Sequence, residues 1–180
     1  MQIFSIESEQ PHTLTYTIFN TPLGKTGVAV TPTGICRVVL SISRESEFIR
    51  TLKTLHPSPK RLPNRLVALE KEFQLYFNNK LKKFSFKPDL GQGTQFQQRV
   101  WNKLTSIPFG ETRSYQWLAT AIGQSKSVRA VGNANGKNPT PVIIPCHRVI
   151  RKNGNLGGFT GGTHLKKYLL DLEEKFDASL

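Results

Sequence analysis

The residues best suited to covalent chemistry are Cys146 and His147, which follow a short apolar run and a proline. A cysteine attacks as its thiolate, and a nearby base or positive charge helps that anion to form. His147 could accept the thiol proton, and Arg148 could add a favourable positive field. Adjacent side chains on an extended chain point to opposite sides, so a relay requires a turn or a bridging water. The pair alone is weak evidence, because a cysteine is more often buried and inert.

Two features farther along the chain favour a reactive Cys146. The segment 154–162 holds five glycines, enough for the backbone to close on a flat ligand. A final helix is predicted over 163–176, and it carries Glu173. This carboxylate could orient His147 as the third member of a nucleophile–base–acid relay, although it would be unremarkable as a solvated charge.

The charge of the chain indicates a polyanionic partner. The 180 residues include 25 Lys and Arg against 12 Asp and Glu, a formal net charge of +13. Nucleic acid is favoured over a membrane surface, and a protein kept soluble by its charge is the bland alternative. Between residues 99 and 167 the only acidic residue is Glu111. The basic residues therefore lie in the same half of the chain as the reactive pair.

The remaining composition excludes several classes of protein. The second cysteine, Cys36, lies in a strand-like run without a nearby histidine, and we expect it to be buried and inert. The spacing of cysteines and histidines predicts no structural zinc site. No apolar run reaches the length of a membrane span. Residues 1–10 lack the pattern of a secretory leader, so we expect a cytoplasmic protein.

The first half of the chain predicts a mixed α/β scaffold without an obvious chemical constellation. Short alternating runs separated by Pro/Gly turns predict an antiparallel meander, and apolar residues at helical spacing follow it. The expected elements are strands over 13–20, 26–31 and 35–41, then helices over 44–55 and 63–79. A Pro/Gly-containing linker over 89–93 separates a domain over 1–88 from one over 94–180.

The second half predicts short helices. Thr94 and Gln97 match a capping box that opens a helix with an apolar face. Ser114 is a good N-cap for a helix over 115–122, and a further helix is expected over 125–135. Two short helices joined by a glycine-containing turn are typical of a helix-turn-helix, although any packed helix pair can give this pattern.

The second of these two helices is rich in small residues: Ala130, Gly132, Ala134 and Gly136 alternate along it. Glycine destabilises a helix interior, so the small side chains need a reason. Tight helix–helix packing is one. Close approach to a nucleic-acid groove is the other, and the neighbouring cations Lys126, Arg129 and Lys137 favour it.

These motifs together resemble the O6-alkylguanine-DNA alkyltransferase family. The matching segments are FGET at 109–112, SY at 114–115, RAVG at 129–132, NP at 138–139 and IPCHRV at 144–149. The glycine-rich segment and Glu173 continue the match. The resemblance is dense over roughly residues 93–174, and the first half matches only in its α/β character.

The resemblance implies an α+β fold: an N-terminal ribonuclease-H-like α/β domain with a small antiparallel sheet, then a mostly helical domain with the helix-turn-helix. It implies direct DNA repair by irreversible, single-turnover transfer of an alkyl group from O6-alkylguanine to Cys146. The partner would be double-stranded DNA, with the damaged base flipped out through the minor groove. A monomer without cofactor or metal is implied. Activity on O4-alkylthymine, cooperativity on DNA and alkyl size are left open.

The resemblance also implies a role for each matching residue. Cys146 would accept the alkyl group, His147 would take its proton through a water, and Glu173 would hold His147. Tyr115 would give a proton to guanine N3, and Arg129 would fill the gap behind the flipped nucleotide. The DNA-facing helix would contribute Ala130, Gly132 and Lys126, and the guanine pocket and its supports would comprise Asn138, Pro141, Leu156, Gly157, Phe159, Thr160, Gly161 and Lys166.

Two departures from the family pattern and two competing functions accompany this interpretation. Phe159 stands where a tyrosine is common, and Gly136 where a longer side chain can occur. A damage sensor related to the family, which binds lesions without transfer, would lack the acceptor, whereas this chain has Cys146. An unrelated cysteine hydrolase would explain neither the basic residues nor the helix that carries Arg129.

Overall fold

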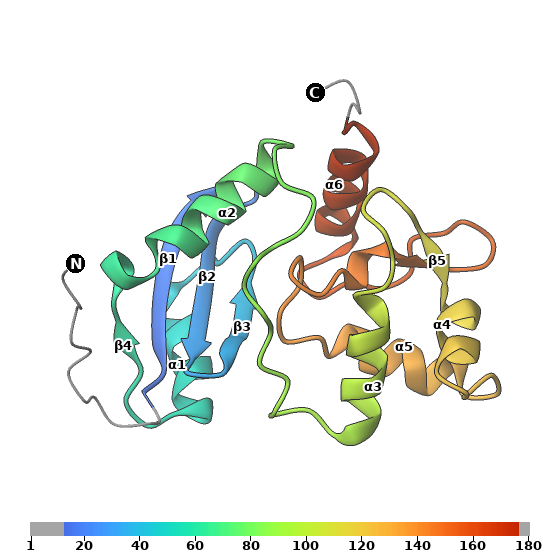
Figure 1. The fold of residues 1–180 in the computed structure, drawn as a ribbon, viewed down its shortest axis with the longest axis horizontal. Helices are drawn as coiled ribbons and strands as arrows, with labels where there is room; N and C mark the ends of the chain where they lie inside the picture. Colours follow the sequence, from blue (N-terminus) through green and yellow to red (C-terminus); the bar gives the residue numbers. More distant parts are fainter. Residues whose placement is uncertain (1–12, 177–180) are drawn as a thin grey trace, which may run out of the picture.

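The computed structural model describes residues 13–176. The stretch 1–10, and the outer ends of the expected domains over 1–88 and 94–180, lie outside the described residues. Figure 1 shows a sheet with a helix on each face in the first half of the chain, and a group of helices beside it in the second half. Within the described part, no helix is long and apolar enough to cross a membrane.

A four-stranded sheet in the order β3-β2-β1-β4 forms the centre of the first half. The predicted meander is confirmed: β1 (Thr15–Thr21), β2 (Gly24–Thr31) and β3 (Gly34–Val39) pair antiparallel in chain order. The expectation of a purely antiparallel sheet is wrong. The two-residue strand β4 (Lys60–Arg61) pairs parallel to β1. Two exposed cations give no alternating apolar signal, so local sequence could not reveal this strand.

Two helices cover opposite faces of this sheet. One is α1 (Glu45–Leu55), and the other is α2 (Val67–Phe77), which follows the short 3-10 helix η1 (Pro63–Arg65). Alternation along the strands divides the core accordingly, because successive side chains point to opposite faces. Tyr16 and Cys36 pack toward α1, and Phe19 and Ile35 pack toward α2.

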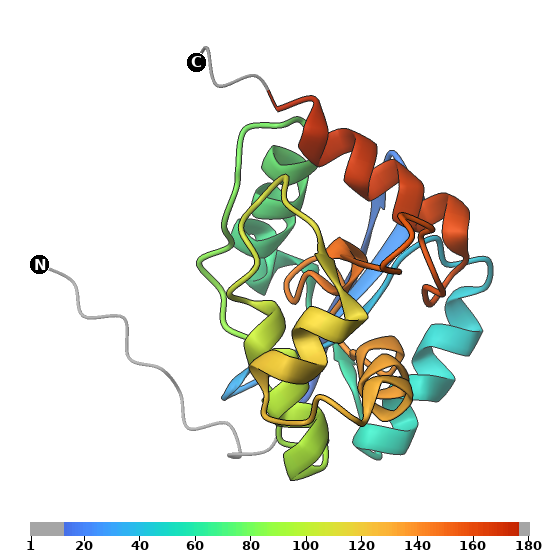
Figure 2. The ribbon, with the colours of Figure 1, turned by 90° about the vertical axis from the view of Figure 1, so that its right-hand side faces the viewer.

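The second half holds four helices and a two-stranded ribbon. The helices are α3 (Gln95–Leu104), α4 (Tyr115–Ala121), α5 (Val128–Gly136) and α6 (Thr163–Glu174). The ribbon pairs β5 (Arg113–Ser114) parallel to β6 (Val149–Ile150), and the 3-10 helix η2 (Cys146–Arg148) precedes β6. Figure 2 shows α4 and α5 side by side on the face turned away from the sheet.

Local signals placed the starts of these helices well, with one exception. The capping box at Thr94 is present, and the Ser114 hydroxyl accepts a hydrogen bond from the Trp117 amide. The helix expected over 125–135 begins only at Val128, because a tight turn comes first: the Ser127 amide donates to Gln124 at 2.8 Å. The final helix ends at Glu174 instead of residue 176.

The two explanations for the small residues of α5 apply to different residues. Ala134 lies against α3, where the Trp101 indole N–H donates to its carbonyl at 2.8 Å. Ala130 and Gly136 are exposed. Gly132 faces Tyr115, with an added Cβ only 3.7 Å from the ring. Tight helix packing therefore accounts for Ala134, whereas Ala130 and Gly136 leave an exposed, smooth surface.

One of the apolar clusters contains residues from both halves of the chain. A single buried cluster contains Phe73 and Tyr76 from α2 together with Val142, Leu165 and Leu169 from the second half. Backbone hydrogen bonds add to it. The Val38 amide of β3 donates to Pro139 at 2.8 Å, and the Asp89 amide of the predicted linker donates to Ile35 at 2.7 Å. The sheet edge therefore directly contacts the segment that leads to Cys146.

Candidate functional site

The turn that precedes Cys146 is held by the side chain of Asn138. Its amide nitrogen donates to the Ile144 carbonyl at 2.8 Å, and its amide oxygen accepts from the Thr140 amide at 3.0 Å. Within this turn Val142 has a φ of 77°, which is rare for a β-branched residue and indicates local strain. Pro141 is buried beside it. The turn is thus rigid and fixes where the following residues lie.

Cys146 begins η2 and is only 5% exposed. Burial raises the pKa of its thiol to about 11, while a hydrogen bond from Asn138 and the positive charge of Lys166 act in the opposite direction. The thiol is therefore protonated at neutral pH and needs a base. The tight turn of η2 replaces the extended chain, and a turn is one of the two conditions that allow a relay between Cys146 and His147.

His147 is fully buried and paired with Glu173. Its Nε2 lies 2.8 Å from Glu173 Oε1. Burial lowers the pKa of His147, although the bond to Glu173 acts to raise it. Because an ionised carboxylate only accepts hydrogen bonds, Nε2 must carry the proton. The other ring nitrogen, Nδ1, is buried and has no hydrogen-bond partner among the described residues. The ring is a neutral imidazole with a free basic nitrogen.

Glu173 receives more donors than the sequence indicated. Besides His147, the Arg148 guanidinium donates from Nε at 2.8 Å and Nη2 at 2.9 Å, Tyr76 Oη donates at 2.7 Å, and the Gly110 amide donates at 3.1 Å. Burial acts to raise the pKa of Glu173, but the bonds from His147 and Arg148 outweigh it and hold that pKa well below its usual value. The carboxylate is firmly ionised.

Arg148 does not play the part expected of it. The sequence suggested that its charge would favour the Cys146 thiolate. Instead, its guanidinium binds Glu173 and donates from Nη1 to the Ile107 carbonyl at 2.7 Å. The cation whose charge lowers the pKa of Cys146 is Lys166. Arg148 is close to Cys146 in the sequence, but the tight turn of η2 directs its side chain toward Glu173.

Lys166 is buried on α6 and ties two segments together. Its ammonium donates to the Val149 carbonyl at 2.6 Å and to the Leu156 carbonyl. It also lies 5.7 Å from the centre of the Tyr115 ring. Burial lowers the pKa of Lys166 to about 8. The lysine therefore connects the strand after Cys146 with the start of the glycine-rich segment.

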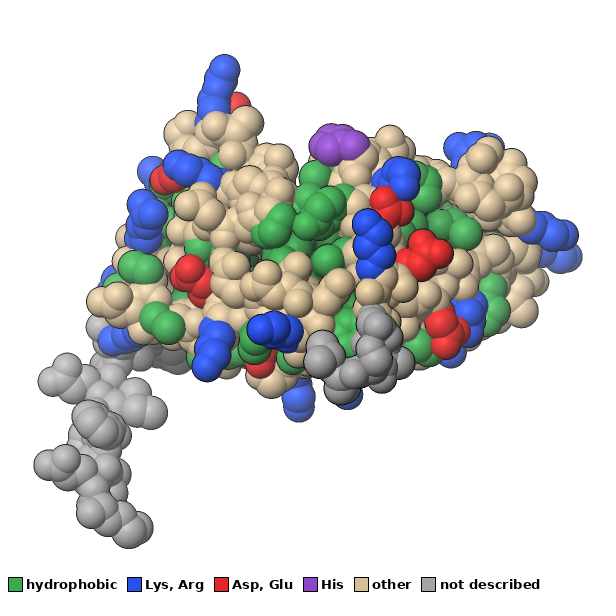
Figure 3. Space-filling view, turned by 90° about the horizontal axis from the view of Figure 1, so that it is seen from above, with side chains coloured by type: hydrophobic (Ala, Val, Ile, Leu, Met, Phe, Trp, Pro, Cys, Tyr) green, Lys and Arg blue, Asp and Glu red, His purple; other side chains and the backbone are tan. Residues whose placement is uncertain are grey.

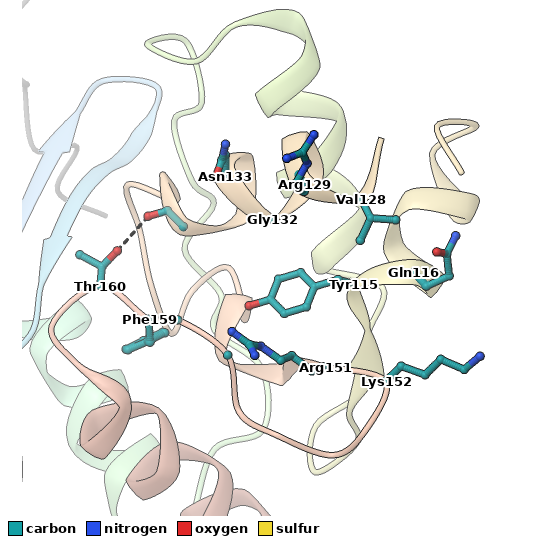
Figure 4. A pocket seen from close by; sticks show the side chains of 13 residues that line it. Tyr115, Gln116, Val128, Arg129, Gly132, Asn133, Arg151, Lys152, Phe159 and Thr160 are labelled. Atoms are coloured by element: carbon teal, nitrogen blue, oxygen red, sulfur yellow. Dashed lines mark hydrogen bonds between the residues drawn. The ribbon is translucent and has the colours of Figure 1, made fainter. Parts of the chain in front are cut away.

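A pocket of about 660 Å³ opens beside this cluster, and the ring of Tyr115 lies across it (Figure 4). Several residues predicted for the site do not line it: Asn138, Pro141, Cys146, Leu156, Gly161 and Lys166. The Thr160 hydroxyl donates to the Gly136 carbonyl at 2.8 Å and joins the two rims. The lining comprises Tyr115, Gln116, Val128, Arg129, Gly132, Asn133, Gly136, Arg151, Lys152, Gly157, Gly158, Phe159 and Thr160.

Gly157 is required by the position of Tyr115. Its φ of 70° favours glycine, and a Cβ added there would lie 3.0 Å from the Tyr115 hydroxyl oxygen. Tyr115 packs partly into the same apolar cluster as Cys146. The tyrosine thus stands between the open pocket and the buried thiol.

Basic side chains surround the pocket. Arg129, Arg151 and Lys152 belong to its lining, and Lys126 is exposed just before α5. In Figure 4 the Arg129 guanidinium points away from Tyr115 and out of the pocket. On another face, which Figure 3 shows from above, lysine and arginine side chains are interspersed with acidic ones, and apolar side chains gather near the centre.

Sequence reasoning missed Tyr76 and the basic rim residues Arg151 and Lys152 as parts of this site. Tyr76 had the spacing of an ordinary core residue on a helix. Arg151 and Lys152 were counted only as part of the basic half. No local pattern relates Tyr76 to Glu173, because 97 residues separate them.

The chain is similar to known proteins over most of its length. Residues 95–175 match the family model described as the DNA-binding domain of 6-O-methylguanine DNA methyltransferase. The constitutive methylated-DNA–protein-cysteine methyltransferase of Bacillus subtilis is 40% identical over 159 residues, which is 88% of this chain and 94% of that protein. The methylated-DNA–protein-cysteine methyltransferase of Methanosarcina barkeri is 37% identical over 161 residues, which is 88% of this chain and 96% of that protein.

Solved structures show the same architecture. The O6-methylguanine methyltransferase of Mycobacterium tuberculosis superposes with a TM-score of 0.80 at 34% identity, over 93% of this chain and 97% of that one. The M. tuberculosis OGT solved in complex with DNA superposes with a TM-score of 0.78 at 35% identity, over 92% of this chain and 96% of that one.

Proposed function

The chain belongs to the methylated-DNA–protein-cysteine methyltransferase family, and we propose that it repairs DNA by moving an alkyl group from O6 of guanine to the sulfur of Cys146. The observation that carries the proposal is a buried thiol followed directly in the chain by a buried imidazole, whose Nε2 is held by Glu173 and whose Nδ1 has no partner among the described residues. The basic rim of the neighbouring pocket supports double-stranded DNA as the partner.

The first step removes the thiol proton. His147 Nδ1 accepts that proton through a bridging water, and the imidazolium that results is stabilised by Glu173. The thiolate sulfur then attacks the alkyl carbon, a carbon–sulfur bond forms and the carbon–O6 bond breaks. Tyr115 gives its proton to guanine N3, so the departing base leaves neutral. Lys166, with its pKa near 8, keeps a positive charge close to the thiolate.

The product is a thioether, and it has no easy route back to a thiol. Each molecule therefore acts once. Both reacting atoms come from protein and DNA, so the transfer as written needs no cofactor.

DNA recognition is proposed from the second half. The pair α4 and α5 would act as a helix-turn-helix in the minor groove, which is only about 6 Å wide and would accept the small side chains of α5. Arg129, exposed on α5, would fill the stack behind the flipped nucleotide. Ala130, Gly132 and Lys126 would face the DNA, and Gly157, Phe159 and Thr160 would contact the guanine.

The finer organisation is proposed along with this function. The first half would be a ribonuclease-H-like scaffold over 1–88, joined by 89–93 to the reactive domain over 94–180, in a chain that acts as a monomer. Asn138, Pro141, Leu156, Gly161 and Lys166 would support the pocket instead of contacting the base.

The test is incubation with a duplex oligonucleotide that carries one O6-methylguanine, followed by intact mass and peptide mapping. We expect a gain of one methylene unit on the Cys146 peptide, saturating at one equivalent. Cys146→Ser should abolish transfer and leave DNA binding largely intact. Cys36→Ser is the matched control, because its buried thiol donates to the Ala29 carbonyl in the other half, and it should transfer normally.

Two outcomes would overturn the proposal. Transfer by Cys146→Ser near the wild-type rate would remove the acceptor. Tight binding of the lesion by the wild-type protein without any mass gain would indicate a sensor instead.

A further inference from the structure

We propose that Tyr76, from the first half of the chain, is a positioning residue for the alkyl-transfer reaction, acting through the carboxylate of Glu173. This inference rests on the proposed function and extends it. Tyr76 Oη lies 2.7 Å from Glu173 Oε1, the same oxygen that His147 Nε2 approaches to 2.8 Å. The phenol and the imidazole are thus neighbours on one atom.

The Tyr76 ring is fixed, so its hydroxyl has one direction. The residue is 1% exposed and meets three aromatic neighbours: Phe77 at 5.4 Å and 77°, Phe84 at 5.5 Å and 40°, and Phe109 at 6.1 Å and 79° between ring planes. Such contacts hold aromatic rings in place. The donor that reaches Glu173 is therefore preorganised by the core of the first half.

Among the described residues, Tyr76 is the only donor to Glu173 from the first half. The others, Gly110, His147 and Arg148, lie in the second half. A second contact acts on the other side of Cys146, where the β3 amide of Val38 donates to Pro139 at 2.8 Å. The first half therefore holds the chain both before and after the thiol.

The phenol should have two effects on the reaction. It restrains Oε1, so the imidazole keeps Nδ1 available for the proton of Cys146. It also shares the negative charge of the carboxylate, which limits how strongly Glu173 favours the imidazolium form of His147. The other charged or titratable groups acting on His147 are Arg148 and Lys166, and Tyr168 lies near Tyr76. With less of that charge shared, the pKa of His147 would rise, and the imidazole would already be protonated, and so unable to accept the thiol proton, over a wider range of acidic pH.

The test is Tyr76→Phe, which removes one oxygen and keeps the ring. Single-turnover transfer from an O6-methylguanine duplex is measured against DNA concentration from pH 5.5 to 9. We expect the rate at saturating DNA to fall about tenfold with an unchanged apparent Kd. The acidic limb of the pH profile should move to higher pH, because less neutralisation of Glu173 favours the imidazolium. A residue that served only folding would change the active fraction and leave that limb in place.

Tyr16→Phe is the matched control, since it removes a phenol oxygen from a buried ring that packs on Phe48 in the cluster under α1. This variant should leave the transfer rate at saturating DNA and the acidic limb of the pH profile unchanged. If Tyr76→Phe folds poorly, 3-fluorotyrosine at position 76 keeps the hydroxyl as a stronger donor and should move the limb to lower pH. An unmoved limb in either variant would overturn the role of Tyr76. Failure of the wild-type protein to transfer would overturn the proposed function instead.

Discussion

At the scale of single residues, the site depends on a buried cluster in which the charge of Glu173 is paired with that of Arg148. Glu173 and Arg148 form an ion pair that is almost completely buried, and His147 stays neutral beside it. Removing one partner of such a pair costs about 3–5 kcal/mol, because the other charge is left unpaired. The cluster therefore couples the reactive thiol to the stability of the fold.

The first residue-scale prediction concerns acid. The pKa of His147 is lowered below 6.5 by burial, and that of Glu173 is lowered below 4.5, so in both cases the unfolded chain binds the proton first. The free energy of unfolding should therefore fall as pH drops below about 6.5, and fall further below about 4.5. Urea unfolding at pH 7.5, 5.5 and 4.0 measures it.

A pair of variants isolates the contribution of His147. His147→Gln should weaken the dependence between pH 7.5 and 5.5, whereas His164→Gln, at an exposed position, should retain it. Equal dependence in both variants would show that another group controls the acid response.

At the scale of elements, the glycine-rich segment is shaped by what packs against it. Lys166 holds its beginning, and Thr160 ties its far end to Gly136. Tyr115 lies against the segment between these points. The segment is thus a wall of the pocket fixed at two places, and glycine is needed where it passes the tyrosine.

The prediction at this scale compares two glycines of the same segment. Gly157→Ala would place a Cβ 3.0 Å from the Tyr115 hydroxyl, whereas Gly154→Ala would meet nothing within 4 Å. Both positions have positive φ, so both variants should lose about 1–2 kcal/mol of stability. Only Gly157→Ala should also slow single-turnover transfer, by about tenfold or more, through displacement of Tyr115. Equal rates in the two variants would contradict the role of this contact.

At the scale of the whole molecule, charge governs association with DNA. The formal net charge of +13 is accompanied by cations around the pocket. Affinity that depends on phosphate contacts weakens as salt increases, because binding releases counterions. Under the proposed function, recognition of the damaged base would then depend on the pocket and not on the charge.

The prediction at this scale is a steep salt dependence. The logarithm of the affinity for undamaged duplex should fall linearly with the logarithm of salt concentration, with a slope that becomes smaller by about 1 in Lys126→Ala. Lys60→Ala, an exposed cation on β4 at the opposite end of the molecule, should leave the slope unchanged. Fluorescence anisotropy between 50 and 200 mM salt measures both, and an equal change in the two variants would argue for nonspecific charge alone.

Several features of this protein could be predicted from local patterns in its sequence. Alternation predicted the three strands of the meander, the capping box at Thr94 predicted the start of α3, and the order of motifs around Cys146 identified the family. These signals are local because strand alternation, helix caps and turns depend on neighbouring residues. Local patterns do not show which side chains of the site contact one another.

Which residues meet at Glu173 depends on the packing of the folded chain. It turned Arg148 away from the thiol, brought Lys166 under two carbonyls, added β4 to the sheet and placed Tyr76 on the carboxylate from 97 residues away. The physical reason is that burial requires each of these polar groups to find a partner, and the packing of the core selects which partner is within reach. The periodicity of apolar residues in the sequence does not show which partner is selected.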